Sequence, residues 1–341
     1  MEQSLFSDPL ILEKIKEAFV QHEYSFISQI GKGGFSVVFL AQSMKYRQNF
    51  VIKVVNNKNQ DETESEIKAL IKLDHPNIIS IFEYFTDDKF IYIVLEYCPG
   101  GTLEKYIKQN GPLPKTLLYQ VCSHLLSALN LCHSLHIAHR DIKPANILID
   151  QYGRPKLADF GLSSEFFNGE NTTNFGGSRL YMAPEIIQKK AYDAFKADIW
   201  ALGVSFYQMA SGSTPWPTEN LNEIEFAISM GMVSFSNVRM DYDFVKIVKS
   251  MIEVNVNKRA TLSYLLERKI IVDNMNSHIS LVSKDAIAPF SMPSKKIARP
   301  VIRDRRASLV EIRKASSNFT LNFRRPSMHK SIYFVPTFSP E

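Results

Sequence analysis

Residues 135–150, LHIAHRDIKPANILID, place polar side chains at fixed spacing directly before an apolar run. Asp141, Lys143 and Asn146 follow one another at intervals of two and three residues. A carboxylate at such a site can orient a hydroxyl nucleophile or accept its proton. An ammonium group can neutralise charge on a phosphoryl group, and an amide oxygen can bind a hard metal ion. Each residue alone is also typical of a polar turn or cap, so the surrounding sequence decides.

Two further stretches add groups suited to the same chemistry. Asp159 in ADFGLS (158–163) is a candidate second metal ligand, thirteen residues after Asn146. The glycines of GKGGFSVV (31–38) let backbone N–H groups approach a phosphate chain, although a glycine-containing hairpin turn explains them equally well. No G-K-[ST] follows and a strand rather than a helix is expected next, which excludes a Walker-type loop.

Lys53 lies in FVIKVV (50–55), with apolar residues on both sides. A lysine on the inward face of a strand needs an anionic partner, because an unpaired buried ammonium group is strongly unfavourable. Glu66, in the helix expected to follow, is the natural partner. Either residue alone is more often a solvated surface charge, but the pair after a glycine loop predicts a functional site.

The apolar spacing predicts a small β-rich segment followed by a largely helical one. Helical spacing at 9–20 precedes the strands. Strands are expected at 24–30, 36–43, 49–55, 78–85 and 90–97. A single helix is expected among them, at 61–73. The later helices are expected at 113–135, 197–212, 243–252 and 261–268. The boundary between the two parts is expected near CPGGT, residues 98–102.

Composition argues against several classes of protein. No stretch offers the roughly 20 uninterrupted apolar residues of a membrane span. The start has early acidic residues and lacks a basic n-region, which predicts no secretory signal. The three cysteines, Cys98, Cys122 and Cys132, cannot all pair and lack metal-ligand spacing. This usage favours a reducing compartment, and we expect a cytoplasmic or nuclear location.

Residues 271–341 differ from the rest in charge and composition. Residues 272–341 carry a net charge of +7, whereas the whole chain carries +5. Ser, Arg and Pro are frequent there, so we predict a basic, mostly disordered tail. RRASL and RRPSM place Ser308 and Ser327 after paired arginines. Nonspecific binding to anionic surfaces is an alternative role, but the arginine clusters are too sparse for us to expect nucleic-acid binding.

The motifs occur in the order found in eukaryotic protein kinases, and the chain resembles that family from Tyr24 to about Leu266. The motifs that carry the resemblance are the glycine loop, Lys53, Glu66, HRD (139–141), Asn146, DFG (159–161), APE (183–185), DIWALG (198–203) and Arg259. The resemblance implies a bilobal α+β fold, with a small antiparallel β lobe that has one main helix and a larger, mainly helical lobe. The implied parts are a helical extension (1–23), the N-lobe (24–98), the C-lobe (99–270) and the tail (271–341).

The resemblance also implies a site for ATP and Mg²⁺ between the lobes. Lys53, paired with Glu66, would hold the α- and β-phosphates, Asn146 and Asp159 would bind two magnesium ions, and Asp141 would orient the substrate hydroxyl. The implied nucleotide-binding residues are Ile30, Gly31, Lys32, Gly33, Gly34, Phe35, Ser36, Val38, Val51, Lys53, Leu95, Glu96, Cys98, Leu148 and Asp159. The implied structural residues are the Glu185–Arg259 pair, Asp198 beneath the catalytic loop, and a packed column of Leu70, Ile81, His139 and Phe160.

Substrate class follows from the same resemblance. DIKPAN, with Lys143, is similar to serine/threonine kinases, and Ser178 stands where they carry a hydroxyl that bonds the catalytic Asp and Lys. The chain resembles the calcium/calmodulin-dependent-kinase-like group most. We therefore expect transfer of the γ-phosphoryl group of ATP to Ser/Thr hydroxyls of protein substrates in signalling. A pseudokinase scaffold that binds nucleotide without turnover is the alternative.

Two positions depart from the family pattern. Ser36 replaces the third loop glycine, and Val51 replaces the usual alanine above the adenine. Neither change removes a group that the chemistry needs. Lys53, Asp141 and Asp159 are all present, which argues against the scaffold.

The activation segment, residues 159–185, is compatible with two modes of regulation. The usual activating threonine position falls on Asn174, directly after Thr172 and Thr173. Such kinases use the residue equivalent to Arg140 to bind a loop phosphate. An upstream kinase could phosphorylate Thr172 or Thr173, or Asn174 could make a constitutive contact.

The tail serines are expected to be substrates of another kinase. Kinases that modify R-R-x-S sites read the arginines with acidic side chains. The aligned residues here, Thr102, Ala145 and Gln208, are uncharged. We therefore expect a different kinase to modify Ser308 and Ser327.

Overall fold

The computed structural model describes residues 6, 8–33, 35–167, 170–216, 220–235, 241–275 and 281. The chain divides into two units, 1–293 and 294–341, and every described residue belongs to the first. Gly34, Ser308, Ser327 and the tail beyond residue 281 lie outside the described residues. Within the described part, no helix has the length and apolar character needed to cross a membrane.

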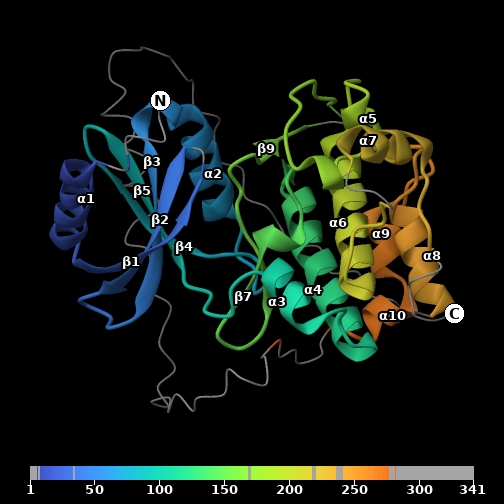
Figure 1. The fold of residues 1–341 in the computed structure, drawn as a ribbon, viewed down its shortest axis with the longest axis horizontal. Coiled ribbons are helices and arrows are strands. Elements are labelled where there is room, and N and C mark those ends of the chain that lie inside the picture. Colours follow the sequence, from blue (N-terminus) through green and yellow to red (C-terminus); the bar gives the residue numbers. More distant parts are fainter. Residues whose placement is uncertain are drawn as a thin grey trace, which may run out of the picture. The chain divides into compact units, whose positions relative to one another are not determined.

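Five antiparallel strands form the smaller lobe (Figure 1). Their order across the sheet is β1 (Tyr24–Lys32), β2 (Ser36–Ser43), β3 (Asn49–Asn56), β5 (Phe90–Glu96) and β4 (Ile81–Thr86). Buried and half-buried residues alternate along β2 and most of β3. Successive side chains of a strand point to opposite faces, so each face of this sheet needs its own cover.

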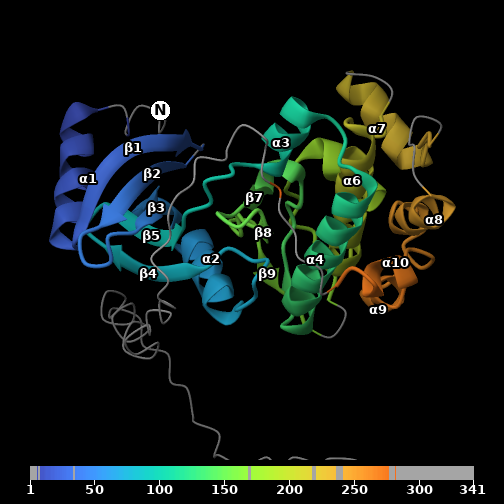
Figure 2. The same cartoon turned by 90° about the horizontal axis from the view of Figure 1, so that it is seen from below.

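Two helices cover the two faces. α1 (Pro9–Gln21) and α2 (Gln60–Lys72) lie on opposite sides of the sheet (Figures 1 and 2). The side chain of Asp8 caps α1 by accepting from the N–H of Leu10 at 2.9 Å. Phe19 of α1 is fully buried, and its ring meets those of Phe39 and Tyr92 at centroid distances of 5.8 and 6.2 Å. The helix predicted at 9–20 is therefore present and packs on the sheet.

β4 begins later than the sequence predicts. The apolar run suggests a strand over 78–85, whereas the strand covers Ile81–Thr86. The N–H of Ile79 donates to the carbonyl of Leu157 at 2.9 Å, and Ile78 forms a bridge with the same residue. The start of this run is therefore paired with the larger lobe instead of with β5.

Helices build most of the larger lobe (Figure 1). They are α3 (Leu103–Asn110), α4 (Lys115–Ser134), α5 (Pro184–Ile187), α6 (Ala194–Ser211), α7 (Leu221–Met230), α8 (Tyr242–Met251), α9 (Leu262–Leu266) and α10 (Lys269–Val272). α6 is buried on nearly all sides, as expected for a helix that others surround. α3, α5, α7 and α10 were not expected from the sequence. In α3, a buried stripe of only Leu103 and Ile107 is too short to reveal a helical period.

Short elements frame the loops between the lobes. Two small antiparallel ladders pair β6 (Ile137–Ala138) with β9 (Ser164–Glu165) and β7 (Ile147–Ile149) with β8 (Pro155–Leu157). Short 3-10 helices are η2 (Asn57–Asn59), η3 (Pro144–Asn146) and η4 (Arg179–Tyr181). Residues 139–146, which contain Asp141, Lys143 and Asn146, lie between β6 and β7, so strand pairing holds both ends of this loop.

Two apolar cores stabilise the fold. One lies between α1 and the sheet, and the other runs from α2, β4 and β5 into the larger lobe. The three cysteines are buried, unpaired thiols. The bilobal α+β architecture predicted from the sequence is confirmed.

Candidate active site

Residues 139–146 follow β6 and are fixed from beneath by Asp198 of α6. The Asp198 carboxylate accepts from the backbone N–H groups of His139 and Arg140, both at 2.8 Å. His133 Nε2 lies 3.0 Å from the same carboxylate, a contact that the sequence analysis missed. A carboxylate this buried is tolerable because several donors compensate its lost hydration. Asp198 therefore braces the catalytic loop, as the resemblance implies.

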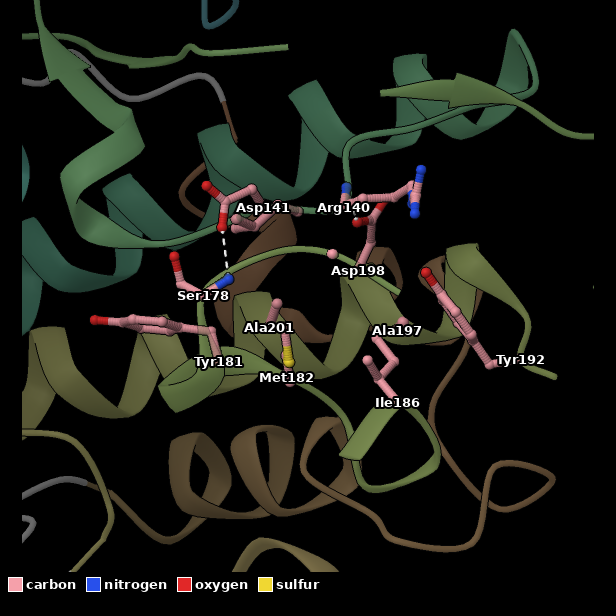
Figure 3. Close-up of a pocket in the computed structure, with 12 residues that line it drawn as sticks. Arg140, Asp141, Ser178, Tyr181, Met182, Ile186, Tyr192, Ala197, Asp198 and Ala201 are labelled. Atoms are coloured by element: carbon pink, nitrogen blue, oxygen red, sulfur yellow. Dashed lines mark hydrogen bonds between the residues drawn. The ribbon is translucent and has the colours of Figure 1, made fainter. Parts of the chain in front are cut away.

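Asp141 lies at the centre of a polar cluster. Its Oδ2 accepts from Lys143 Nζ at 2.7 Å and from Asn146 Nδ2 at 2.9 Å. Its Oδ1 accepts from the backbone N–H of Ser178 at 3.0 Å, and Figure 3 shows the carboxylate directed at that group. The structure thus brings the three polar residues of the first motif together with the activation segment.

The hydroxyl of Ser178 makes one of the two contacts expected of it, the one to Lys143. Its hydroxyl accepts from Lys143 Nζ at 2.6 Å, in agreement with the sequence analysis. The bond to Asp141 comes from the backbone N–H of Ser178 rather than from the hydroxyl. The hydroxyl therefore serves Lys143, while the backbone fixes the carboxylate.

Lys53 of β3 connects the two lobes electrostatically. Its Nζ lies 2.8 Å from both carboxylate oxygens of Glu66 in α2 and 3.3 Å from Oδ1 of Asp159. The side chains of Lys53 and Glu66 are 15% and 5% exposed. Burial alone lowers the pKa of Lys53, but the charges of Glu66 and Asp159 outweigh it and leave that pKa above its ordinary value. The predicted pair is present, and Asp159 joins it.

Asn146 and Asp159 have the chemistry of magnesium ligands. Asn146 Nδ2 donates to the backbone carbonyl and to the carboxylate of Asp141, both at 2.9 Å, which leaves the amide oxygen for a cation. Burial raises the pKa of Asp159, but the nearby charges, of which Lys53 is the strongest, and the hydrogen bond from Lys53 together lower it more, so the carboxylate is ionised at neutral pH. Mg²⁺ is usually held by one or two such oxygen groups together with substrate phosphates. The donor set fits this ion.

The glycine-loop residues lie at the junction of β1 and β2. The N–H of Gly33 donates to the carbonyl of Ser36 at 2.7 Å. Ile30, Phe35 and Lys32 are exposed there. Two further pairs of the implied nucleotide-binding residues face each other across neighbouring strands. Gly31 of β1 lies opposite Val38 of β2, and Val51 of β3 lies opposite Leu95 of β5.

The other implied nucleotide contacts lie between the lobes. Leu148 of β7 forms a bridge with Thr102, so it reaches the site from the larger lobe. Cys98 is buried, and burial followed by the charge of Glu96 raises the pKa of its thiol well above the ordinary value. The thiol is therefore protonated at neutral pH and unsuited to nucleophilic chemistry.

Lys156 of β8 is a buried cation that the sequence analysis missed. Its Nζ lies 2.8 Å from Oε2 of Glu96, and its side chain is 5% exposed. Lys156 has apolar neighbours in the sequence, as Lys53 does, but its partner Glu96 is 60 residues away, so the sequence alone did not indicate the pair. The pair links the end of β5 to the larger lobe.

The implied structural residues are also assembled. The rings of His139 and Phe160 lie 4.6 Å apart, and both residues are fully buried. Leu70 and Ile81 belong to the same core as Phe160. The buried Arg259 and Glu185 of α5 form two hydrogen bonds, of 2.7 and 2.9 Å.

The guanidinium of Arg140 donates hydrogen bonds to oxygen atoms of the activation segment. Its Nη1 donates to the carbonyl of Leu162 and to Oγ of Ser164, both at 3.2 Å. Its Nη2 donates to the backbone carbonyl of Asn174, which also accepts from the hydroxyl of Tyr192 at 2.9 Å. The contact expected of Asn174 is thus made by its backbone and not by its side chain.

Comparisons with known proteins agree with this geometry. The protein kinase domain family matches residues 24–271. Sperm motility kinase W of Mus musculus is 37% identical over 218 residues, which are 63% of this chain and 44% of that protein. Sperm motility kinase 2B of Mus musculus is 30% identical over 246 residues, or 72% of this chain and 51% of that protein.

The chain spans about half the length of the curated relatives that it matches. The family match, by contrast, covers most of the chain and contains both polar clusters, the glycine loop and the Glu185–Arg259 pair. The order of motifs, the bilobal fold and this match agree with one another. The chain belongs to the eukaryotic protein kinase family.

Proposed function

We propose that this chain transfers the γ-phosphoryl group of ATP to serine or threonine hydroxyls of protein substrates, with Mg²⁺ as the metal. One observation carries the proposal: the two polar clusters are both complete. Lys53, Glu66 and Asp159 form the first, and Asp141, Lys143, Asn146 and Ser178 form the second. The contact between Lys143 and Ser178 supports the serine/threonine class.

The second cluster prepares a hydroxyl for attack. Asp141 accepts from three donors of the chain, and these fix the direction of its carboxylate. A substrate hydroxyl beside it donates to the carboxylate and turns its lone pair toward the phosphoryl group. Lys143 lies close enough to neutralise charge that develops on that group.

The first cluster serves the nucleotide. Lys53 is held by Glu66 and presents a cation toward the phosphates of ATP, while Asp159 and the amide oxygen of Asn146 would hold Mg²⁺. The bound ion supplies charge neutralisation across the phosphates. Positioning and charge stabilisation make up most of phosphoryl-transfer catalysis, so these pre-formed clusters are what the reaction needs.

The test is phosphate incorporation from labelled ATP and Mg²⁺ into a generic protein substrate, with identification of the modified amino acid. Asp141→Asn should reduce the rate by about 100-fold or more, because it removes the acceptor for the hydroxyl proton. ATP binding should persist, since Asp141 lies outside the Lys53 cluster. Asp243→Asn, at an exposed position of α8, is the matched control.

Two outcomes would contradict the proposal. ATP binding by the unaltered chain without any incorporation, before and after treatment with an activating kinase, would establish the nucleotide-binding scaffold instead. Incorporation into tyrosine alone would retain the kinase and overturn the serine/threonine class.

A further inference from the structure

Arg179 lies directly beside the group that contacts the catalytic carboxylate. It follows Ser178, whose backbone N–H donates to Asp141 (Figure 3) and whose hydroxyl accepts from Lys143. Consecutive Cα atoms are about 3.8 Å apart, and the side chain of Arg179 is 62% exposed. An exposed guanidinium is therefore attached to the residue next to the one whose backbone fixes the Asp141 carboxylate.

The guanidinium is held weakly. Its Nη1 lies 3.3 Å from Oε1 of Glu225 in α7. Exposed ion pairs contribute little stability because water and salt screen them. A guanidinium also presents five N–H donors in a planar fork that matches a carboxylate. A substrate carboxylate can therefore compete with Glu225 for Arg179.

The charges around this position differ from one side to the other. Tyr181, two residues after Arg179, is buried, and its hydroxyl donates to Oε1 of Gln208 at 2.5 Å. Burial, followed by the charge of Glu104 in α3, raises the pKa of that hydroxyl. The guanidinium of Arg179 is directed instead toward Glu225 of α7.

We propose that Arg179 makes this kinase prefer protein substrates with an aspartate or glutamate directly beside the phosphoacceptor. The proposal rests on the kinase function proposed above. A substrate carboxylate would form a charge-assisted pair with Arg179, and a lysine or arginine at the same place would meet a like charge. The residue would then determine specificity by attraction and by repulsion.

The experiment uses serine peptides in a neutral Ala/Gly background. A single aspartate is moved across three positions on each side of the serine, and kcat/KM is divided by that of the neutral peptide. The unaltered chain should show a ratio of about five at one flanking position, the upper range for an exposed pair. Arg179→Gln should bring the ratio to about one, and Arg179→Lys should restore part of it because the charge returns.

Glu225→Gln separates specificity from a structural role. It removes the carboxylate that competes for Arg179, so the ratio should rise above that of the unaltered chain. If Arg179 merely held α7 in place, Arg179→Gln and Glu225→Gln would break the same pair and change the rates for acidic and neutral peptides alike. Lys246→Gln, an exposed position of α8, controls for the lost positive charge.

The two proposals fail in different ways. Equal ratios for the unaltered chain and Arg179→Gln, with serine phosphorylation intact, would overturn the role of Arg179 alone. Absence of Asp141-dependent incorporation into every peptide and into the generic protein substrate would overturn the kinase function itself.

Discussion

Arg140 already has acceptors for its guanidinium within the chain. Leu162, Ser164 and the backbone of Asn174 supply three oxygens, and Tyr192 ties Asn174 to the segment before α6. The buried Nε–H of Arg140 has no hydrogen-bond partner among the described residues. A phosphate on Thr172 or Thr173 would thus add one contact to an arrangement that is held without it. This favours the constitutive alternative over an upstream kinase.

Thr173 is exposed, and we expect Thr173→Val to keep kcat/KM within about twofold of the unaltered chain. Arg140→Met removes the charged donors and should lower kcat/KM by about tenfold or more. Both variants are measured together with the unaltered chain, each before and after phosphatase treatment. Equal losses in the two variants would show that Arg140 acts through a phosphate on Thr173.

The active-site residues were predictable from sequence to different degrees. Asp141, Lys53 and Glu66 could be named because phosphoryl transfer needs particular residue types in a fixed order along the chain. Lys156 and Arg179 could not, because a lone Lys or Arg is usually a solvated surface residue. Their carboxylate partners, Glu96 for Lys156 and Glu225 for Arg179, are distant in the sequence, and only the fold brings each pair together.

At the scale of elements, the strands with alternating burial and the longest helices were predicted, whereas α3 and α7 were not. The strands β2 and β3 were located to within one residue of their bounds, because alternating burial leaves a clear pattern. β4 was misplaced because buried apolar residues look the same whether they pair with β5 or with the other lobe. α3 was missed for lack of a sufficiently long stripe.

α1 should contribute strongly to stability although it precedes the family match. Phe19 is fully buried against Phe39 and Tyr92, and removing such a ring leaves a cavity. Phe19→Ala should therefore lower the free energy of unfolding by about 3 kcal/mol or more. Val20→Ala, on the 59% exposed side of the same helix, should change it by less than about 0.5 kcal/mol. Urea unfolding measures both, and similar values for the two variants would contradict the packing of α1.

At the scale of the whole molecule, buried tyrosines predict a loss of stability in alkali. Tyr24 donates to Glu83 and Tyr92 to Asp87, both at 2.6 Å. Burial, followed by these hydrogen bonds, raises the pKa of both hydroxyls above the ordinary value of 10.0. The unfolded chain then loses protons near pH 10 while the folded chain keeps them. The stabilisation is complete below that pH and decreases as the pH rises above it.

Above pH 10 each of these tyrosines should steepen the alkaline fall in unfolding free energy, by about 1.4 kcal/mol per pH unit at most. Tyr24→Phe should remove one such contribution. Urea unfolding between pH 8 and pH 10.5 gives the slopes directly. A slope that Tyr24→Phe leaves unaltered would mean that Tyr24 titrates equally in both states.

The cover that α1 provides has a practical consequence for where the protein can be cut. Family limits, here residues 24–271, record where relatives share sequence, whereas a foldable unit is delimited by the apolar surface that it must keep from water. A shortened chain that starts at Tyr24 would expose the sheet face that contains Phe39 and Tyr92 and would tend to aggregate. The smallest soluble catalytic fragment should therefore retain Asp8, whose side chain starts the helix.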